Sequence, residues 1–313
     1  MQAGSEEARG RNNGYEDMGE VPQTHSIGPD ASARLARVRF VLVAPSHVGN
    51  IGACARAIRS MGFTRLHVVR PQDAQFRTAP QALALAAGGA DVLAQARAFD
   101  SLTEALEGVH LALATTGYAR EFAGEPLEIR RAAQTVAQAL EEQEAQVAFV
   151  FGPERTGLSN LDVQCCHLSC SIPADPERGS LNLAQAAQVV AYECRREILA
   201  GAQQSDQPRP RADFSRTQAR PQETPASIEQ TEAMFAHLEQ GLAAVGYLDP
   251  REPKHLLARL RRLLLRARPT ATEVDILRGI ASAMILPRTL RAGSKSAAKG
   301  AAKVQASEGR GPD

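Results

Sequence analysis

The chain has no tryptophan, few aromatic residues, little net charge and no long apolar run. Aromatic residues supply only 4% of its 313 residues, which argues against a stacking platform for single-stranded nucleic acid. With a net charge of +1, affinity for nucleic acid would have to come from local basic patches. No segment approaches the roughly 18 apolar residues that span a membrane, and the N-terminus lacks the apolar core of a signal peptide. We therefore expect no membrane contact.

Cysteine is also scarce, and its number is odd. Five cysteines in 313 residues favour reduced thiols and a cytoplasmic location over a disulfide framework. The run from Cys165 to Cys170 includes Cys166 and His167 and superficially resembles a metal cluster. Its spacing is not the paired C-x-x-C of zinc sites, and the run enters a segment with the pattern of a buried strand. We expect no metal.

Over residues 38–202, short β-rich runs alternate with segments of helical periodicity. This alternation predicts a doubly wound α/β domain with a parallel sheet and helices on both faces. The expected strands are residues 38–43, 66–69, 109–115, 147–151 and 168–172. The expected helices are residues 50–61, a helix opened by a capping box at 101–104, 129–142 and 181–199.

The composition changes on both sides of this domain. Residues 1–37 are rich in glycine, glutamate, asparagine and serine, and we expect them to form a disordered extension. Residues 203–226 are rich in proline and form a predicted linker. Residues 227–287 carry three helical patterns and predict a small C-terminal all-α domain. The low-complexity tail, residues 288–313, is expected to be disordered.

The segment after the first strand carries Asn50, Gly52 and Arg56 in an N-x-G-x-x-x-R pattern. It lacks both glycine fingerprints of nucleotide-binding loops, G-x-G-x-x-G and G-x-x-x-x-G-K-[ST]. A plain strand-to-helix turn with permissive glycines would account for most of the segment. Arg56 does not fit that interpretation, because an arginine among small and apolar helical positions usually contacts a ligand or a carboxylate. Spacing alone leaves both interpretations open.

Two further polar segments follow predicted strands. The segment 151–158 (F-G-P-E-R-T-G-L) begins where ligands of α/β folds bind, at the carboxyl end of a strand. Glu154 and Arg155 could instead form only a salt bridge on the rim. In the segment S-L-N-L at 180–183, Ser180 suits a helix N-cap, which would place Asn182 at the second helical position.

Together, these three segments resemble the three ordered motifs of the TrmH-like SPOUT RNA 2′-O-methyltransferases. The resemblance to the TrmJ type within that family covers about residues 37–287. In the first domain it includes His47, residues 84–91 (A-L-A-A-G-G-A-D), Cys166-His167 and residues 188–195. In the second domain it includes residues 235–239, 260–263, 266–269 and 273–279.

The resemblance implies a SPOUT-type fold, in which the parallel sheet ends in a deep trefoil knot that general folding rules would not predict. It also implies S-adenosyl-L-methionine (SAM) as the cofactor, held largely by backbone groups of the knot loops. The cofactor-binding positions carried over are Thr115, Thr116, Gly117, Gly152, Ile172, Gly179, Ser180 and Leu181. The catalytic positions carried over are Arg56, Asn50, Glu154, Ser180 and Asn182.

Enzymes of this type are tRNA (cytidine/uridine-32)-2′-O-methyltransferases of the anticodon loop and act as homodimers. The resemblance therefore implies tRNA as the substrate and a second copy of the chain as a partner. In the family, the arginine at the position of Arg56 activates or holds the ribose hydroxyl. Because an arginine is normally fully protonated, we expect Arg56 to stabilise developing alkoxide charge and to anchor phosphate.

The C-terminal helical region has a local cationic excess that suits RNA. Residues 251–291 contain ten Lys/Arg against three Asp/Glu. Arg259, Arg262 and Arg266 share one face of the second helix in this region, and we expect them to bind RNA. The apolar face expected for the same helix consists of Leu256, Leu257, Leu260, Leu263, Leu264 and Ala267. A solvated amphipathic helix packed in a bundle accounts for this leucine face, but it does not account for the cationic excess.

Three alternatives stay open. The target could be another tRNA nucleotide or an rRNA nucleotide. The chain could be an RNA-binding module without catalysis, although Asn50, Arg56 and Asn182 are all present. It could also be a nucleotide-dependent oxidoreductase on a Rossmann sheet, and the missing glycine fingerprint argues against that class.

Overall fold

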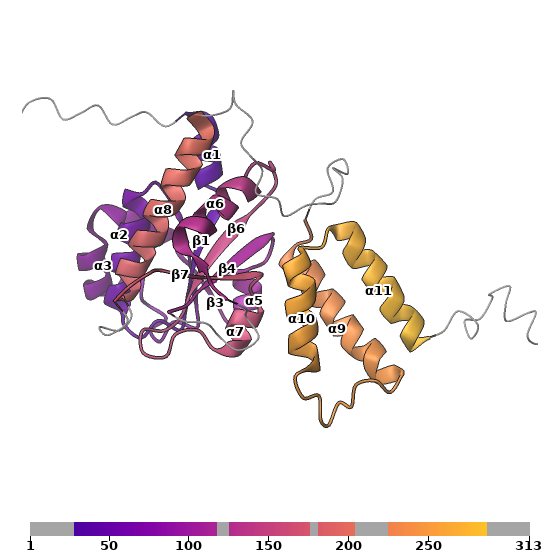
Figure 1. Ribbon diagram of the computed structural model, residues 1–313. Coiled ribbons are helices and arrows are strands. Elements are labelled where there is room, and N and C mark those ends of the chain that lie inside the picture. The colour runs from indigo at the N-terminus through magenta and orange to yellow at the C-terminus, as the bar shows by residue number, and fades with distance from the viewer. Residues whose placement is uncertain (1–27, 118–124, 176–180, 204–224, 287–313) are drawn as a thin grey trace, which may run out of the picture.

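The computed structural model describes residues 28–117, 125–175, 181–203 and 225–286. They form an α/β domain and, after it, a group of three helices beside the domain (Figure 1). Among the helices that the structure describes, none is long and apolar enough to cross a membrane. All five cysteines lie in the described residues and are free thiols.

The α/β domain is built on a seven-stranded sheet with the strand order β3-β2-β1-β6-β4-β7-β5. All of its pairings are parallel. The strands are β1 (Val38–Val43), β2 (Arg65–Val69), β3 (Arg97–Phe99), β4 (Leu111–Thr115), β5 (Leu127–Glu128), β6 (Val147–Phe151) and β7 (Leu168–Ser171). The central strands are almost continuously apolar, as expected for a parallel sheet that is covered on both faces.

Side chains alternate along each strand, so the sheet contributes to two separate cores. The helices of this domain are α1 (Pro29–Leu35), α2 (Val48–Ser60), α3 (Pro80–Ala86), the 3-10 helix η1 (Ala87–Gly89), α4 (Ala90–Gln95), α5 (Leu102–Ala105), α6 (Ile129–Ala139), α7 (Asn160–Gln164) and α8 (Leu183–Gln203). Phe40 and Leu42 of β1 belong to the larger core with α2, α6 and α8. Val41 and Val43 belong to the smaller core with α5 and α7. Figure 1 shows α2 and α8 on one side of the sheet and α5 and α7 on the other.

Three neighbouring strands end side by side at the carboxyl edge of the sheet. Thr115, the last residue of β4, is paired with Phe151 of β6 and with Cys170 of β7. The backbone N–H of Thr116 also donates to Cys170 O over 2.8 Å. The segments that leave β4, β6 and β7 therefore start close together, at the edge where ligands of parallel sheets bind.

The C-terminal domain consists of α9 (Ile228–Ala244), α10 (Leu256–Ala267) and α11 (Ala271–Ile285). Capping boxes open two of these helices, at Ser227 for α9 and at Thr270 for α11. The start of α9 anchors this domain to the α/β domain. Ile228 is 1% exposed and belongs to the smaller core, and Gly108 N donates to the Glu229 carboxylate over 2.5 Å.

The doubly wound parallel sheet and the C-terminal helices are confirmed, and the ends of the expected elements shift by a few residues. The sheet has seven strands where five were expected, because the short strands β3 and β5 were not predicted. The prediction that the whole of residues 1–37 is disordered is wrong, because α1 is helical and buries Ala31 and Leu35. This helix has only seven residues and buries only two of them, so its sequence carries little helical pattern. The remaining boundaries, including the linker at 203–226 and the tail at 288–313, lie largely outside the described residues and stay predictions.

The apolar face predicted for α10 is rotated from the observed one. Leu265, which was not in the predicted face, is the buried leucine of this helix. Leu263, which was in it, is 52% exposed. The reason is that Leu264 and Leu265 of α10 belong to the core shared with α9 and α11. Arg261 pairs with Glu232 of α9, and its guanidinium group lies over the Phe235 ring.

The trefoil knot stays a prediction. The knot loops expected from the resemblance include residues 118–124 and 176–180, which lie outside the described residues. The order of the strands is known, but the path of these two segments decides whether the chain passes through a loop.

Candidate active site

A chain of hydrogen bonds joins the first two polar motifs at the carboxyl edge of the sheet. Glu154, in the loop after β6, accepts a hydrogen bond of 2.6 Å from Asn50 Nδ2 and one of 2.9 Å from Ser46 N. Asn50 lies in the first turn of α2, which follows β1. Because β1 and β6 are paired neighbours, the loops that follow them meet. The sequence predicted Asn50 and Glu154 as site residues, and the structure brings them together.

Glu154 is held as an anion in this setting. Partial burial acts to raise the pKa of its carboxyl group, but the hydrogen bonds from Asn50 and from the Ser46 backbone outweigh burial, so the pKa is lowered. The carboxylate also lies at the N-terminal end of α2, where negative charge is favoured by the helix dipole. Glu154 therefore suits a positioning role for Asn50 better than a role in moving a proton at neutral pH.

Asn182 extends the network to the third motif. Its Nδ2 donates to Asn50 Oδ1 over 3.3 Å. Its Oδ1 accepts from Ala184 N over 2.9 Å, and its own N–H donates to Gln185 Oε1 over 3.2 Å. Asn182 is thus the N-cap of α8 rather than its second residue, and the predicted helical position is wrong. Ser180, the predicted cap, lies outside the described residues.

Arg56 is not part of this network. It lies six residues after Asn50 in α2, which places it about 9 Å further along the helix and about 120° around its axis. The side chain is exposed, and no described residue forms a hydrogen bond or ion pair with it. The guanidinium group is therefore free to bind a group from outside this chain. Whether Arg56 is catalytic stays a prediction.

Two glycines hold α3 and η1 against the face of α2 that carries Arg56. A Cβ on Gly52 would lie 2.0 Å from Ala82 O, and a Cβ on Gly89 would lie 2.6 Å from the backbone N and Cα of Arg56. Contacts this short leave no room for a side chain, so both positions require glycine. The glycine of the first motif is thus explained by helix packing, and the backbone of Arg56 is held in place by Gly89.

The predicted cofactor positions gather at the ends of β4, β6 and β7. Thr115 closes β4, Thr116 and Gly117 follow it, Gly152 follows β6, and Ile172 follows β7. Thr116 is only 7% exposed, and its buried hydroxyl has no hydrogen-bond partner among the described residues. A buried donor without a partner is costly and marks a place where a ligand could bind.

The other predicted cofactor positions lie in the segment before α8. Leu181 is exposed next to Asn182. Gly179 and Ser180 lie outside the described residues. The structure therefore places Leu181 beside the network and leaves the roles of Gly179 and Ser180 as predictions.

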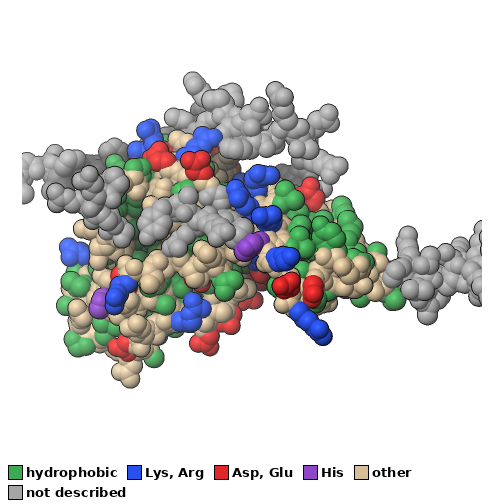
Figure 2. Space-filling view, turned by 60° about the horizontal axis from the view of Figure 1, so that its bottom comes forward, with side chains coloured by type: hydrophobic (Ala, Val, Ile, Leu, Met, Phe, Trp, Pro, Cys, Tyr) green, Lys and Arg blue, Asp and Glu red, His purple; other side chains and the backbone are tan. Residues whose placement is uncertain are grey.

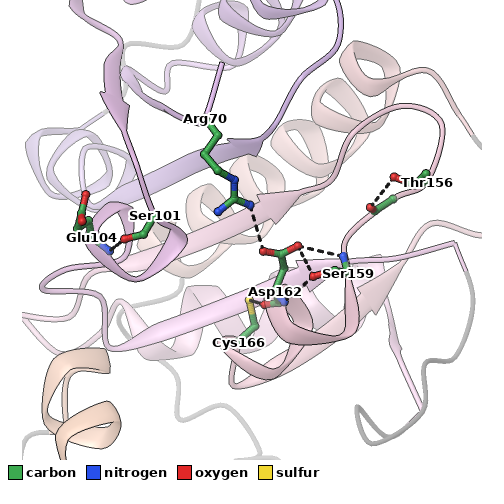
Figure 3. A network of polar contacts seen from close by, with 8 residues as sticks. Arg70, Ser101, Glu104, Thr156, Ser159, Asp162 and Cys166 are labelled. Carbon is green, nitrogen blue, oxygen red and sulfur yellow. Dashed lines mark hydrogen bonds and ion pairs between the residues drawn. The ribbon is translucent and has the colours of Figure 1, made fainter. Parts of the chain in front are cut away.

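The loop from Gly152 to Leu158 is compact and firmly attached at its far end. A Cβ on Gly152 would lie 2.2 Å from Leu158 N, so the loop folds back on itself. Beyond the loop, Ser159 and Asp162 form the capping box of α7, and Arg70 at the end of β2 lies 3.6 Å from the Asp162 carboxylate (Figure 3). These contacts fix the loop that carries Glu154.

Two residues of the network were not predicted. Ser46 contributes only a backbone N–H, and a side-chain pattern gives no signal for that. Gln185, the third residue of α8, accepts a hydrogen bond at its side-chain oxygen from the backbone N–H of Asn182. An Asn followed three residues later by Gln is a recognisable capping-box signal, and it was available in the sequence.

The Cys165–Cys170 run has structural partners. The Cys166 thiol donates to Asp162 O over 3.6 Å, and His167 Nδ1 accepts from Ala112 N over 3.0 Å. Burial raises the pKa of the Cys170 thiol to about 12. In the part of the chain that the structure describes, no three His, Cys, Asp or Glu side chains are grouped so that they could hold a metal ion.

The predicted RNA-binding arginines all lie on the surface of α10. Arg259, Arg262 and Arg266 are exposed, and none of them forms an ion pair or hydrogen bond with a described residue. Figure 2 shows Lys and Arg side chains gathered where the helical domain meets the α/β domain. The unpaired guanidinium groups of the three α10 arginines are compatible with phosphate binding.

Both domains match known protein families. Residues 37–192 match the SpoU rRNA Methylase family, and residues 229–296 match the C-terminal domain of the tRNA methyltransferase TrmJ. The chain is 41% identical to tRNA (cytidine/uridine-2′-O-)-methyltransferase TrmJ of Pectobacterium atrosepticum over 80% of this chain and 97% of that protein. It is 42% identical to tRNA (cytidine/uridine/adenosine-2′-O-)-methyltransferase TrmJ of Pseudomonas aeruginosa over 79% of this chain and 93% of that protein.

A solved structure extends the similarity to three dimensions. The crystal structure of TrmJ from Z. mobilis covers 79% of this chain, and this chain covers 98% of it, with 34% sequence identity and a TM-score of 0.64. The similarity therefore spans both domains rather than the parallel sheet alone.

Proposed function

This chain belongs to the TrmJ family of SpoU methyltransferases, and we propose that it transfers a methyl group from SAM to the ribose 2′-hydroxyl of nucleotide 32 in the anticodon loop of tRNA, accepting C or U. The observation that carries the proposal is the hydrogen-bonded Glu154–Asn50–Asn182 network. It lies at the carboxyl edge of the sheet, beside the predicted cofactor loops, in a chain whose two domains both match the family.

The residues at this edge fit the cofactor. The backbone groups of Thr115 to Gly117, Gly152 and Ile172 would hold SAM, and the unpartnered Thr116 hydroxyl supplies a hydrogen bond that no described residue takes. A Cβ on Gly117 would meet nothing within 4 Å, so the space beside this residue is open. When bound there, SAM supplies an electrophilic methyl group.

The chain has to activate a poor nucleophile and align it. Arg56 would lie against the ribose hydroxyl and an adjoining phosphate, stabilising the alkoxide charge that develops as the hydroxyl proton passes to water. An arginine stays protonated at neutral pH, so its contribution is electrostatic. Asn50, held by Glu154, and Asn182, held at the start of α8, would orient the ribose so that its oxygen lies in line with the methyl group. Ser180 is proposed to complete this set.

A homodimer would bring Arg56 to the cofactor loops of the partner. The proposal is supported by Arg56, whose side chain is exposed and forms no hydrogen bond with the Asn50–Glu154 network of its own chain. Four exposed apolar side chains near α2 also support it. Leu83 and Leu85 lie on α3, Tyr192 lies on α8, and Leu181 lies just before α8. Exposed apolar side chains that lie together in one patch often mark an interface.

We also propose that the C-terminal helices hold tRNA through Arg259, Arg262 and Arg266. Their exposed, unpaired guanidinium groups on one helix support this role. With this role for the arginines, the proposed division of the chain is an α/β catalytic domain, a linker and a helical RNA-binding domain. We also propose a cytoplasmic location, because the tRNA substrate is found there.

The test is to incubate the protein with methyl-labelled SAM and total tRNA and to map 2′-O-methylation by nucleotide. Transcripts with C, U, A or G at nucleotide 32 then define base preference. We expect label at nucleotide 32 of transcripts with C or U. Label at another tRNA nucleotide or only in rRNA would redefine the target, and absence of transfer to any RNA, with RNA binding intact, would indicate a binding module.

A further inference from the structure

A pocket of about 220 Å³ lies between the two domains, away from the network at the carboxyl edge of the sheet. From the α/β domain it is lined by the end of α7, the start of β7 and Glu125. From the helical domain it is lined by α10. The lining residues include Gln164, His167, Leu168, Arg262, Leu265 and Arg266.

The polar groups of this pocket are mainly hydrogen-bond donors. Arg262 and Arg266 have no hydrogen-bond or ion-pair partner among the described residues. His167 Nδ1 accepts from Ala112 N, so the ring carries its proton on Nε2 and can donate from there. Burial lowers the pKa of His167 to about 4, and the ring is therefore neutral. Glu125 is the single carboxylate of the lining, and Gln164 can both donate and accept.

The rest of the lining is apolar except for Arg261, which pairs with Glu232 of α9. Val163, Leu168 and Leu265 line the pocket beside the donors. A donor-rich end next to an apolar wall fits a nucleotide, with its phosphate on the arginines and its sugar or base against the leucines. The volume lies below the roughly 300–1,000 Å³ of ordinary ligand pockets, so the pocket takes at most one nucleotide.

The surroundings favour a nucleotide of a polymer over a free anion. Arg259 lies on the same face of α10 as Arg262 and Arg266 but does not line the pocket. The row of arginines therefore continues out of the pocket, as a run of successive phosphates would require. Both walls also belong to domains that match the tRNA methyltransferase family.

We propose that this interdomain pocket binds one nucleotide of the tRNA substrate, with its phosphate between Arg262 and Arg266 and its edge against Gln164 and His167. The inference rests on the proposed function. The nucleotide is not the one that is methylated on the same chain, because the pocket lies at the amino end of β7 and the cofactor loops lie at its carboxyl end, about 13 Å away.

The pocket can be closed from the side of the α/β domain. Gln164→Trp would fill it without removing a charge, and Leu161→Trp is the matched control, because Leu161 lies on the same short helix, is 75% exposed and does not line the pocket. Affinity for a tRNA transcript is measured at several salt concentrations. We expect Gln164→Trp to weaken binding on the order of tenfold and Leu161→Trp to leave it unchanged, with SAM affinity unaltered in both.

The arginines are tested in the same assay. Arg262→Gln and Arg266→Gln should each weaken binding and lower the salt slope by about 0.7–0.9, as expected for one lost phosphate contact. Arg278→Gln, on the exposed surface of α11, is the control. Cytidine 5′-monophosphate and inorganic phosphate are titrated as competitors. Crosslinking of 4-thiouridine-substituted tRNA should label the peptide with Gln164 to Leu168.

The outcomes separate this inference from the proposed function. If the wild-type protein methylates tRNA but Gln164→Trp binds and turns over like Leu161→Trp, the pocket inference is wrong and the function stands. If inorganic phosphate competes as well as the nucleotide and no crosslink reaches the Gln164 peptide, the pocket is a free-anion site and the inference is also wrong. If the wild-type protein transfers no methyl group to any RNA, the proposed function is wrong, and the pocket inference, which rests on it, is wrong as well.

Discussion

Asn50 Nδ2 donates a hydrogen bond of 2.6 Å to Glu154 Oε1, although the two residues are 104 positions apart in the chain. The contact forms because the loops after β1 and β6 leave neighbouring strands at the same edge. Glu154 also accepts from Ser46 N, so one carboxylate holds both the start of α2 and the amide of Asn50. The orientation of the Asn50 amide therefore depends on Glu154, together with the longer hydrogen bond from Asn182.

Glu154→Gln tests that dependence. Glutamine offers one acceptor oxygen and one donor group, whereas two donors point at Glu154, so one of them would lose its partner. We expect turnover to fall by about 10- to 100-fold, corresponding to about 1–3 kcal/mol, measured as single-turnover methyl transfer to tRNA. Glu141→Gln, in an exposed position just after α6, is the control. Equal rates for both variants would show that Glu154 has no positioning role.

Arg56→Ala should remove methyl transfer while the fold stays intact. The side chain is exposed and has no described partner, so its loss should not change the melting temperature. If Arg56 stabilises the developing alkoxide, the rate should fall by about 10²- to 10³-fold with SAM affinity unchanged. Arg59→Ala, one turn further along the same helix, should turn over normally, because among the described residues the Arg59 side chain pairs only with Asp91. A similar loss in both variants would mean that α2 needs its general positive charge rather than Arg56.

Mixed dimers test whether Arg56 acts on the partner's cofactor loops. The second variant must block the cofactor without damaging the loop, and Gly152 is unsuitable because its Cβ would meet the Leu158 backbone at 2.2 Å. Gly117 has open space beside it, so Gly117→Trp should fold and exclude SAM. Each variant alone should be inactive, and mixing Arg56→Ala with Gly117→Trp should restore activity. With subunit exchange verified by tagged pull-down, absence of rescue would place the whole site within one chain.

Two adjacent glycines provide a matched pair for the packing of η1 on α2. A Cβ on Gly89 would lie 2.6 Å from the Arg56 backbone, whereas a Cβ on Gly88 would meet nothing within 4 Å. We expect Gly89→Ala to lower the free energy of unfolding by about 1–3 kcal/mol and to reduce turnover by displacing Arg56. The free energy of unfolding of Gly88→Ala should stay within about 0.5 kcal/mol of the wild-type value. Urea denaturation of both variants decides the matter, and equal stability would show that η1 can move away freely.

His67 should make the stability of the fold depend on pH. Burial, together with the positive charge of Arg39, lowers the pKa of His67 to about 4 from 6.5. Between these values the unfolded chain binds a proton that the folded chain does not, so stability is present above pH 6.5 and is lost as the pH falls toward 4. For this one group the loss at pH 5 relative to pH 7 should be about 2 kcal/mol.

The measurement compares the wild type with His67→Gln by urea denaturation at pH 7 and pH 5. Other groups titrate equally in both proteins, so the difference between the two proteins isolates His67. The variant loses the packing of the ring on Phe99 at both pH values, but it should lose less additional stability at pH 5. A difference that does not change with pH would contradict the low pKa.

Much of the fold was predictable because it depends on local patterns. The apolar runs of β1, β4 and β6 and the periodicity of α2, α6 and α9 were sufficient to predict a doubly wound sheet and a separate helical domain. The short elements α3, η1 and α4 were not predicted, because the Ala- and Gly-rich segment 79–95 has no clear amphipathic period. They pack against α2 through glycines, and a composition pattern does not reveal that contact.

The sequence alone predicted the candidate site residues and their order, since N-x-G-x-x-x-R, F-G-x-E and S-L-N-L lie within short segments, and it is the order of these local motifs that resembles the family. Tertiary structure decided how they are connected. The strand order places β1 beside β6, so Asn50 meets Glu154, and the capping of α8 turns Asn182 toward Asn50. It also separated Arg56 from these residues, because six residues of α-helix turn a side chain to a different face. Contacts between segments 104 and 132 positions apart depend on packing of the whole sheet, and no local pattern carries that information.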